Sequence, residues 1–295
     1  GLILPMFLMG IYFYIKTLKD GWFSNIKKYW GFALKIGLPM IPHSLAMVVL
    51  TQIDRIMITR MCGNSDTGLY SFGFSYAILL ALFSNAVLQA YQPWLYIKYK
   101  EKDLVSIKSS NNIIATTMCI VTIMIIAVAP EAIKVLGAKS FWMAKWVVLP
   151  VAIGSLFQYI YNTYISLELY HKKTKVIAVG TIFSAIINYY LNSTFIPVFG
   201  YIAAAYATCA SYFILAFFHL FACRKVTQKQ IYDDKFIWGI AVITALISFL
   251  FVRLYDYFII RYVLLLIGLA IVGFLQKQKL ISAYNLVFKK GDVEN

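Results

Sequence analysis

Long apolar runs alternate with short polar segments along the whole chain. A helix needs about 20 mostly apolar residues to cross the hydrocarbon core of a bilayer. Nine segments approach or meet this length, and we expect each of them to form a transmembrane helix. They are residues 1–16, 33–60, 67–97, 109–130, 141–169, 174–196, 200–223, 236–254 and 258–276. The pattern therefore predicts an all-α fold, a polytopic transmembrane helical bundle.

Composition and charge support this interpretation. The chain is 61% hydrophobic and only 13% charged, whereas soluble domains are about 45–50% apolar and about 25% charged. A net charge of +15 is also found in nucleic-acid-binding proteins. Here the cations lie in short clusters between apolar runs, as in the cytoplasmic loops of membrane proteins. We therefore expect no nucleic-acid partner.

The distribution of cations predicts the orientation. Twenty of the 27 Lys and Arg residues lie in alternate loops or at the span ends that adjoin them, six lie in or beside the loops between them, and Arg55 lies well inside a span. Cytoplasmic loops carry the excess of Lys and Arg, so we expect a multi-pass protein of the cell (inner, cytoplasmic) membrane with its C-terminus in the cytoplasm. Nine spans then place residue 1 outside, which suggests a missing front part.

Four stretches carry a more specific pattern. They are Gly37–Ser44 with Gln52–Ile58, then Gly68–Ser71, then Gln89–Trp94, and a series of short motifs from Lys173 to Tyr212. In this order and spacing they resemble the polysaccharide (O-antigen and capsule) flippases of the multidrug/oligosaccharidyl-lipid/polysaccharide exporter superfamily. The resemblance implies a transporter of two six-helix lobes, of which this chain is the C-terminal part.

The resemblance also implies a division of the chain. Residues 1–16 would be the last helix of the first lobe, and 17–32 a cytoplasmic interfacial linker. Residues 33–225 would form the second six-helix transmembrane lobe. Two extra C-terminal transmembrane helices would occupy 226–276, and 277–295 would be a cytoplasmic tail.

The implied activity is transport and not catalysis. The substrate would be an undecaprenyl-diphosphate-linked oligosaccharide, moved from the cytoplasmic to the outer leaflet for O-antigen, lipopolysaccharide or capsule biosynthesis. Membrane lipids, a polysaccharide polymerase and glycosyltransferases would be partners. We expect no cofactor, and coupling to H+ or Na+ stays open. The alternative is a drug or metabolite exporter of the same superfamily. A membrane enzyme is disfavoured because the outer loops are short, at most about ten residues.

Ionisable side chains within spans mark candidate sites, because each costs about 2.5–3.5 kcal/mol at a helix centre. Asp54 and Arg55 lie in the outer part of the span 33–60, near Gln52. As neighbours they point about 100° apart on a helix and do not form an ideal pair. Arg55 either faces the cavity and binds the diphosphate through its planar fork, or snorkels to the outer interface.

A polar stripe follows one face of the span 67–97. Asn85, Gln89, Gln92 and Tyr96 recur at helical spacing and offer donors and acceptors that suit sugar hydroxyls. The alternative is hydrogen bonding between helices. The predicted substrate path comprises Arg55, Asp54, Gln52, Asn85, Gln89, Gln92 and Tyr96.

Other polar residues are interpreted as structural. The stripe of Thr181, Ser184, Asn188 and Asn192, and the small residues that recur every four positions from Gly200 to Ser211, favour close helix packing.

Titratable groups elsewhere in the spans have no catalytic or metal-binding spacing. Glu168 lies near Lys172 and Lys173, which favours a local ion pair over a proton-coupling site. The three histidines are far apart in sequence, without a ligand motif, and are interpreted as structural; they are His43, His171 and His219.

Overall fold

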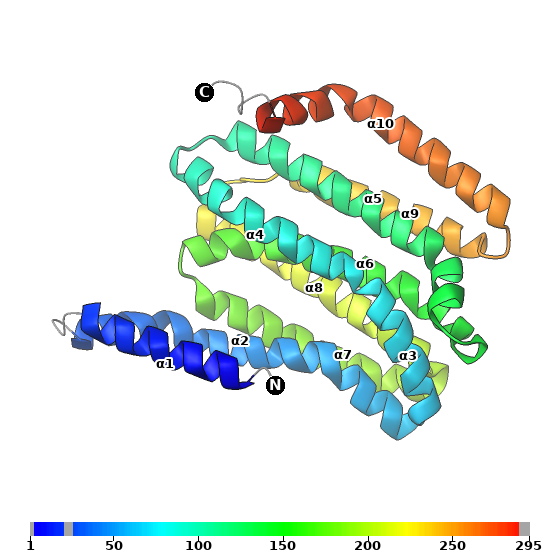
Figure 1. Cartoon of the computed structure of the whole chain (residues 1–295), viewed down its shortest axis with the longest axis horizontal. Coiled ribbons are helices and arrows are strands. Elements are labelled where there is room, and N and C mark those ends of the chain that lie inside the picture. The colour runs from blue at the N-terminus through cyan, green and yellow to red at the C-terminus, as the bar shows by residue number, and fades with distance from the viewer. Residues whose placement is uncertain (1–2, 21–25, 289–295) are drawn as a thin grey trace.

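A computed structural model describes residues 3–20 and 26–288. They form ten α-helices and one short 3-10 helix, η1, arranged as a layered bundle (Figure 1). The elements are α1 (Ile3–Asp20), α2 (Ile26–Met61), α3 (Asn64–Ala77), α4 (Leu79–Lys100), α5 (Leu104–Leu136), η1 (Lys139–Ala144), α6 (Lys145–Tyr170), α7 (Thr174–Phe199), α8 (Tyr201–Thr227), α9 (Asp234–Arg253) and α10 (Phe258–Phe288).

Among the described residues, seven helical segments are long and apolar enough to cross a membrane. They run from Lys27 to Arg253 and correspond to the second to eighth predicted spans. The described apolar part of α10, Phe258–Ile271, is shorter. The all-α prediction of a polytopic transmembrane helical bundle is therefore confirmed.

Helix α6 lies at the centre of the bundle. Of the 18 most apolar consecutive residues in its segment, 67% are buried. Helix α8 packs along α6 and also along α7, while α2 packs on α7. Gly154 makes the contact between α6 and α8 close, because a Cβ there would lie 3.2 Å from the Cα atom of Cys209. On the other side α5 packs on α6 and α9, and α10 covers α5 (Figure 1).

The third predicted span is divided at Ile78, and its two parts run in different directions (Figure 1). The first part, α3, approaches η1 and the start of α6 closely at Gly73, where a Cβ would lie 2.5 Å from the carbonyl oxygen of Ala144. Helices α2, α4 and α6 continue past the prolines within them, which are Pro39, Pro42, Pro93 and Pro150.

The predicted boundaries at the two ends differ from the observed helices. Within the proposed linker 17–32, residues 17–20 complete α1 and residues 26–32 already belong to α2. Bulky and basic residues in this stretch are compatible with a helix at the membrane interface, so α2 begins earlier than its apolar run. Helix α10 likewise continues into the proposed tail 277–295. Residues 21–25 and 289–295 lie outside the described part.

The polar stripe of α7 is buried against α8. The Ser184 hydroxyl donates to the carbonyl oxygen of Ser211 at 2.7 Å, and Asn188 Nδ2 donates to Thr208 Oγ1 at 3.1 Å. The two helices are joined by Gly200 alone, whose φ of 70° is readily adopted only by glycine. Helix packing, predicted for this stripe and for the small residues of α8, is confirmed.

Candidate functional site

A buried carboxylate links four helices in one half of the bundle. Asp54 on α2 is fully buried. Its Oδ2 accepts hydrogen bonds from the Tyr70 hydroxyl on α3 at 2.5 Å and from the Thr208 hydroxyl on α8 at 2.6 Å. Its Oδ1 accepts from Asn192 Nδ2 on α7 at 2.6 Å. We call these four residues the Asp54 cluster. Their donors satisfy the carboxylate inside the bundle, away from the surface.

The neighbouring Arg55 takes a different direction, as adjacency on a helix predicts. It is half-buried, its Nε donates to Ser71 Oγ at 3.2 Å, and its Nη1 donates to Gln52 Oε1 at 2.8 Å. The guanidinium carbon lies 4.8 Å from the ring centroid of Phe74. Among the described residues, no carboxylate forms a salt bridge with Arg55. Neutral partners therefore orient the guanidinium and leave its charge available to an anion.

The two ends of the polar stripe of α4 have different surroundings. Gln92 Nε2 donates to the Tyr96 hydroxyl at 2.7 Å, and that hydroxyl donates to the backbone oxygen of Ser166 on α6 at 3.0 Å. This end of the stripe holds two helices together. The exposed Asn85 and Gln89 lie at the other end and line, with Gln92, a pocket of about 190 Å³ between α4 and α6.

The predicted path residues thus divide between two places. Arg55, Asp54 and Gln52 lie on α2, which packs on α7 and α3, whereas the stripe lies on α4, which packs on α6 and α5. The described lining of the α4–α6 pocket contains none of the three α2 residues. Asp54 does not reach the surface that Gln52 presents, and its role in transport stays a prediction.

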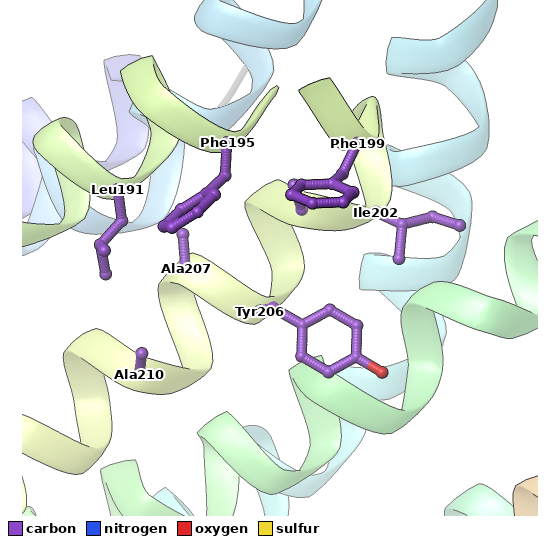
Figure 2. Close-up of a pocket in the computed structure, with 8 residues that line it drawn as sticks. Leu191, Phe195, Phe199, Ile202, Tyr206, Ala207 and Ala210 are labelled. Carbon is purple, nitrogen blue, oxygen red and sulfur yellow. The ribbon is translucent and has the colours of Figure 1, made fainter. Parts of the chain in front are cut away.

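A larger cavity, of about 640 Å³, lies between α7 and α8. Figure 2 shows the rings of Phe195 and Phe199 from α7 and of Tyr206 from α8 around it, with small side chains such as Ala207 between them. Its lining is almost wholly apolar, so it suits a hydrocarbon chain and offers little that could recognise a sugar or a phosphate.

Glu168 corrects one sequence prediction. Its Oε1 lies 2.9 Å from His219 Nδ1 on α8, and both side chains are fully buried. It does not pair with Lys172 or Lys173. Helix α6 ends at Tyr170 and the chain turns at Lys172, whose φ is 56°. The turn carries the lysines away, whereas the Glu168 side chain faces the interior of the bundle.

The other histidines also have partners from distant parts of the chain. His43 Nδ1 on α2 lies 2.8 Å from Thr181 Oγ1 on α7, and His171 Nε2 lies 2.8 Å from the Tyr99 hydroxyl. Sequence reasoning missed these contacts because the partners are 138 and 72 residues apart. The sequence offered a signal for His43 alone, since an ionisable side chain within an apolar span usually faces the interior of the bundle and finds a polar partner there.

Two further ion pairs fix the C-terminal helices. Arg224 donates to Asp234 at the start of α9, and the Tyr164 hydroxyl donates to the same carboxylate at 2.9 Å. Arg261 on α10 is fully buried and pairs with Glu131 of α5. These contacts attach α9 and α10 to the central helices.

Comparison with known proteins supports a likeness to polysaccharide biosynthesis proteins. Residues 1–97 match the family described as polysaccharide biosynthesis protein. The chain is similar to a Haemophilus influenzae protein named for the Lsg locus, with 26% identity over 190 residues, which is 63% of this chain and 47% of that protein. It is also similar to an uncharacterized membrane protein of the same organism, with 27% identity over 173 residues, or 57% of this chain and 42% of the relative. The matched part of this chain therefore spans less than half the length of either relative. No solved structure matches the chain.

Proposed function

The chain is a multi-pass membrane protein similar to the polysaccharide biosynthesis proteins, and from this premise we propose that it is part of a lipid-linked oligosaccharide flippase. In this proposal it moves an undecaprenyl-diphosphate-linked oligosaccharide from the cytoplasmic to the outer leaflet by alternating access. The region that matches the family is the main support for this proposal. Residues 1–97 include α2, α3 and most of α4, and these helices contain every residue of the predicted substrate path.

The two places on α2 and α4 suit the two parts of such a substrate. Arg55, oriented by Ser71 and Gln52, would contact the diphosphate, since a guanidinium binds phosphate oxygens through two parallel hydrogen bonds. The amides of Asn85 and Gln89 would contact sugar hydroxyls, because an amide both donates and accepts. The Asp54 cluster would act indirectly by fixing the α2 face from which Arg55 projects.

The whole transporter would unite these places across a cavity between two lobes, with residues 33–225 as the second lobe. It would lie in the cytoplasmic membrane with its C-terminus inside. Glycosyltransferases would supply the cargo, and a polysaccharide polymerase would receive it on the outer side.

The experiment is depletion of the protein followed by measurement of lipid-linked glycan on each leaflet. We expect glycan to accumulate on the cytoplasmic side. Complementation with Arg55→Ala should lower export per folded molecule at least about tenfold, which corresponds to 1.4 kcal/mol, and Arg55→Lys should restore only part of it, because lysine lacks the planar fork.

Arg60→Ala is the matched control, since Arg60 is an exposed arginine on the same helix. It should export at the normal rate. Unchanged specific export in Arg55→Ala would reduce Arg55 to a membrane anchor. Normal distribution of glycan after depletion would refute the flippase and favour another cargo.

A further inference from the structure

Another cavity, of about 600 Å³, lies where α7 begins and α8 ends. Lys173, directly before α7, and Lys225, in the last turn of α8, line it. The rings of Phe218 and Phe221 belong to the same lining. We call this cavity the lysine pocket. The cavity in Figure 2 is formed by the other ends of the same two helices, and the two linings share no residue.

The lysine pocket has an apolar level and a charged level. Phe218, Ala222 and Lys225 recur at helical spacing, so they share one face of α8. The seven residues from Phe218 to Lys225 span roughly 10 Å of helix. Phe218 lies inside the apolar run 200–223, whereas Lys225 lies just beyond it. A lysine at the end of a span keeps its stem on apolar surface and its amine near the lipid headgroups, so the pocket matches the two parts of a phospholipid.

The apolar level is supported on one side and open on the other. Gly180 of α7 leaves room for the Phe218 ring, because a Cβ there would lie 2.6 Å from the Cδ1 atom of that ring. Phe221 is 52% exposed, and the exposed ring of Phe217 packs beside it with 4.9 Å between the centroids. Both rings belong to a segment long and apolar enough to cross a membrane. Rings exposed at this depth would contact acyl chains.

The charge of the pocket is not neutralised by the described part of the chain. The flanking residues 171–176 and 222–230 contain three Lys or Arg each and no Asp or Glu. Neither Lys173 nor Lys225 forms a salt bridge with a described residue. The acid at the start of α9 is already paired with Arg224. Two ammonium groups attract an anionic headgroup, whereas a zwitterionic headgroup would bring a further cation beside them.

We propose that the lysine pocket binds an anionic phospholipid of the surrounding membrane, with its phosphate between Lys173 and Lys225. One acyl chain lies along Phe218 and Phe221. Clusters of lysine at the ends of spans attract acidic lipids, and here the apolar lining adds a place for the chain. Because the two lysines belong to different helices, the lipid connects the start of α7 to the end of α8. The ligand is a membrane lipid and not the cargo, so the site does not depend on the proposed function.

The first test titrates the delipidated full-length protein with phosphatidylglycerol or phosphatidylcholine and detects the first bound lipid by native mass spectrometry. We expect tighter binding of phosphatidylglycerol. Lys173→Gln with Lys225→Gln should weaken its binding roughly 30-fold, because a lysine near the headgroups contributes about fivefold in affinity. Lys100→Gln with Lys108→Gln is the matched control, since it removes the same charge outside the pocket.

Three results of this titration would overturn the proposal. Equal affinity of the wild type for the two lipids would do so without any substitution. Unchanged binding after loss of both pocket lysines would exclude the pocket. Equal weakening in the control would show a general effect of net charge. A polyprenyl diphosphate that displaces phosphatidylglycerol at a lower concentration would assign the pocket to the cargo and also contradict the proposal.

The second test concerns the apolar level. Ala222→Leu fills the lysine pocket without a change of charge, and Ala210→Leu fills the cavity of Figure 2; both alanines are half-buried on α8. We expect only Ala222→Leu to weaken binding of phosphatidylglycerol several-fold. Phosphatidylglycerol should raise the melting temperature of the wild type and of Ala210→Leu, because a ligand stabilises the state that binds it. Melting without lipid shows that each variant is folded. Full binding by Ala222→Leu would mean that no acyl chain occupies the pocket, which would refute the site.

Discussion

Asp54 and Glu168 are fully buried in the same bundle, and their surroundings differ. Asp54 accepts three hydrogen bonds from side chains of three other helices. Glu168 meets one imidazole, and its other oxygen has no partner among the described residues. A buried charge persists where donors surround it. Both oxygens of Asp54 thus have donors, whereas Glu168 has a single partner on one oxygen among the described residues. Burial alone does not distinguish the two carboxylates, but the number of donors does.

The largest effect on stability should follow removal of the Asp54 carboxylate. Asp54→Ala leaves three buried donors without their acceptor, and each such group costs about 1–3 kcal/mol. We expect a loss of about 3 kcal/mol or more in the free energy of unfolding, measured by thermal denaturation in detergent. Asp256→Ala is the control, since that carboxylate is 85% exposed. If Asp54→Ala and the wild type have equal melting temperatures, the donors around Asp54 do not make it more important for stability than Glu168.

A smaller effect should follow removal of one donor. Tyr70→Phe deletes the hydroxyl at 2.5 Å from Asp54 and leaves two donors in place. Net hydrogen bonds contribute about 0.5–1.5 kcal/mol in proteins, so we expect a loss of about 1 kcal/mol in the same assay. Tyr189→Phe, at an exposed tyrosine of α7, should be silent. A loss as large as that of Asp54→Ala would mean that Tyr70 alone holds the cluster.

A still smaller effect is expected at Glu168. Glutamine keeps an Oε1 that can accept from His219 Nδ1, so Glu168→Gln should change the free energy of unfolding by less than about 0.5 kcal/mol. The same denaturation assay measures this difference. If the substitution unfolds the protein as Asp54→Ala does, then Glu168 is also a structural anion and the comparison fails.

Asp54 and Glu168 also show which parts of the structure can be predicted from the sequence. The apolar runs predict the seven central spans, and spacing alone predicts the buried face from Thr181 to Asn192, because both depend on local helical periodicity. The partner of Glu168 depends on which helices are neighbours in space. Its nearest cations in sequence lie beyond the end of α6, whereas His219 is 51 residues away. For the same reason the sequence places Asp54 in a span but gives no hint of Thr208, 154 residues away.

A third carboxylate, on the surface, provides the smallest expected effect. Asp103 caps α5 by accepting from the Ser106 backbone N–H at 3.1 Å. Hydrogen bonds with Ser106, and then the nearby Lys98, lower the pKa of this carboxyl below its ordinary value of 3.8. Its stabilising contribution is therefore present above about pH 4 and is lost as the pH falls through the lowered pKa. Asp103→Ala should melt slightly below the wild type at pH 7, and the difference should shrink in acid. A difference in melting temperature that grows in acid would contradict a stabilising role of the ionised Asp103.

The separation between Asp54 and its partners has a consequence for biosynthesis. The chain is made from the N-terminus at about 5–20 residues per second, and Asn192 follows Asp54 by 138 residues. Helix α2 therefore waits roughly 7–28 s for α7 after its own synthesis. During that interval only Tyr70, 16 residues away, can shield the carboxylate. The nascent protein thus passes through a period in which the Asp54 carboxylate lacks two of its three donors.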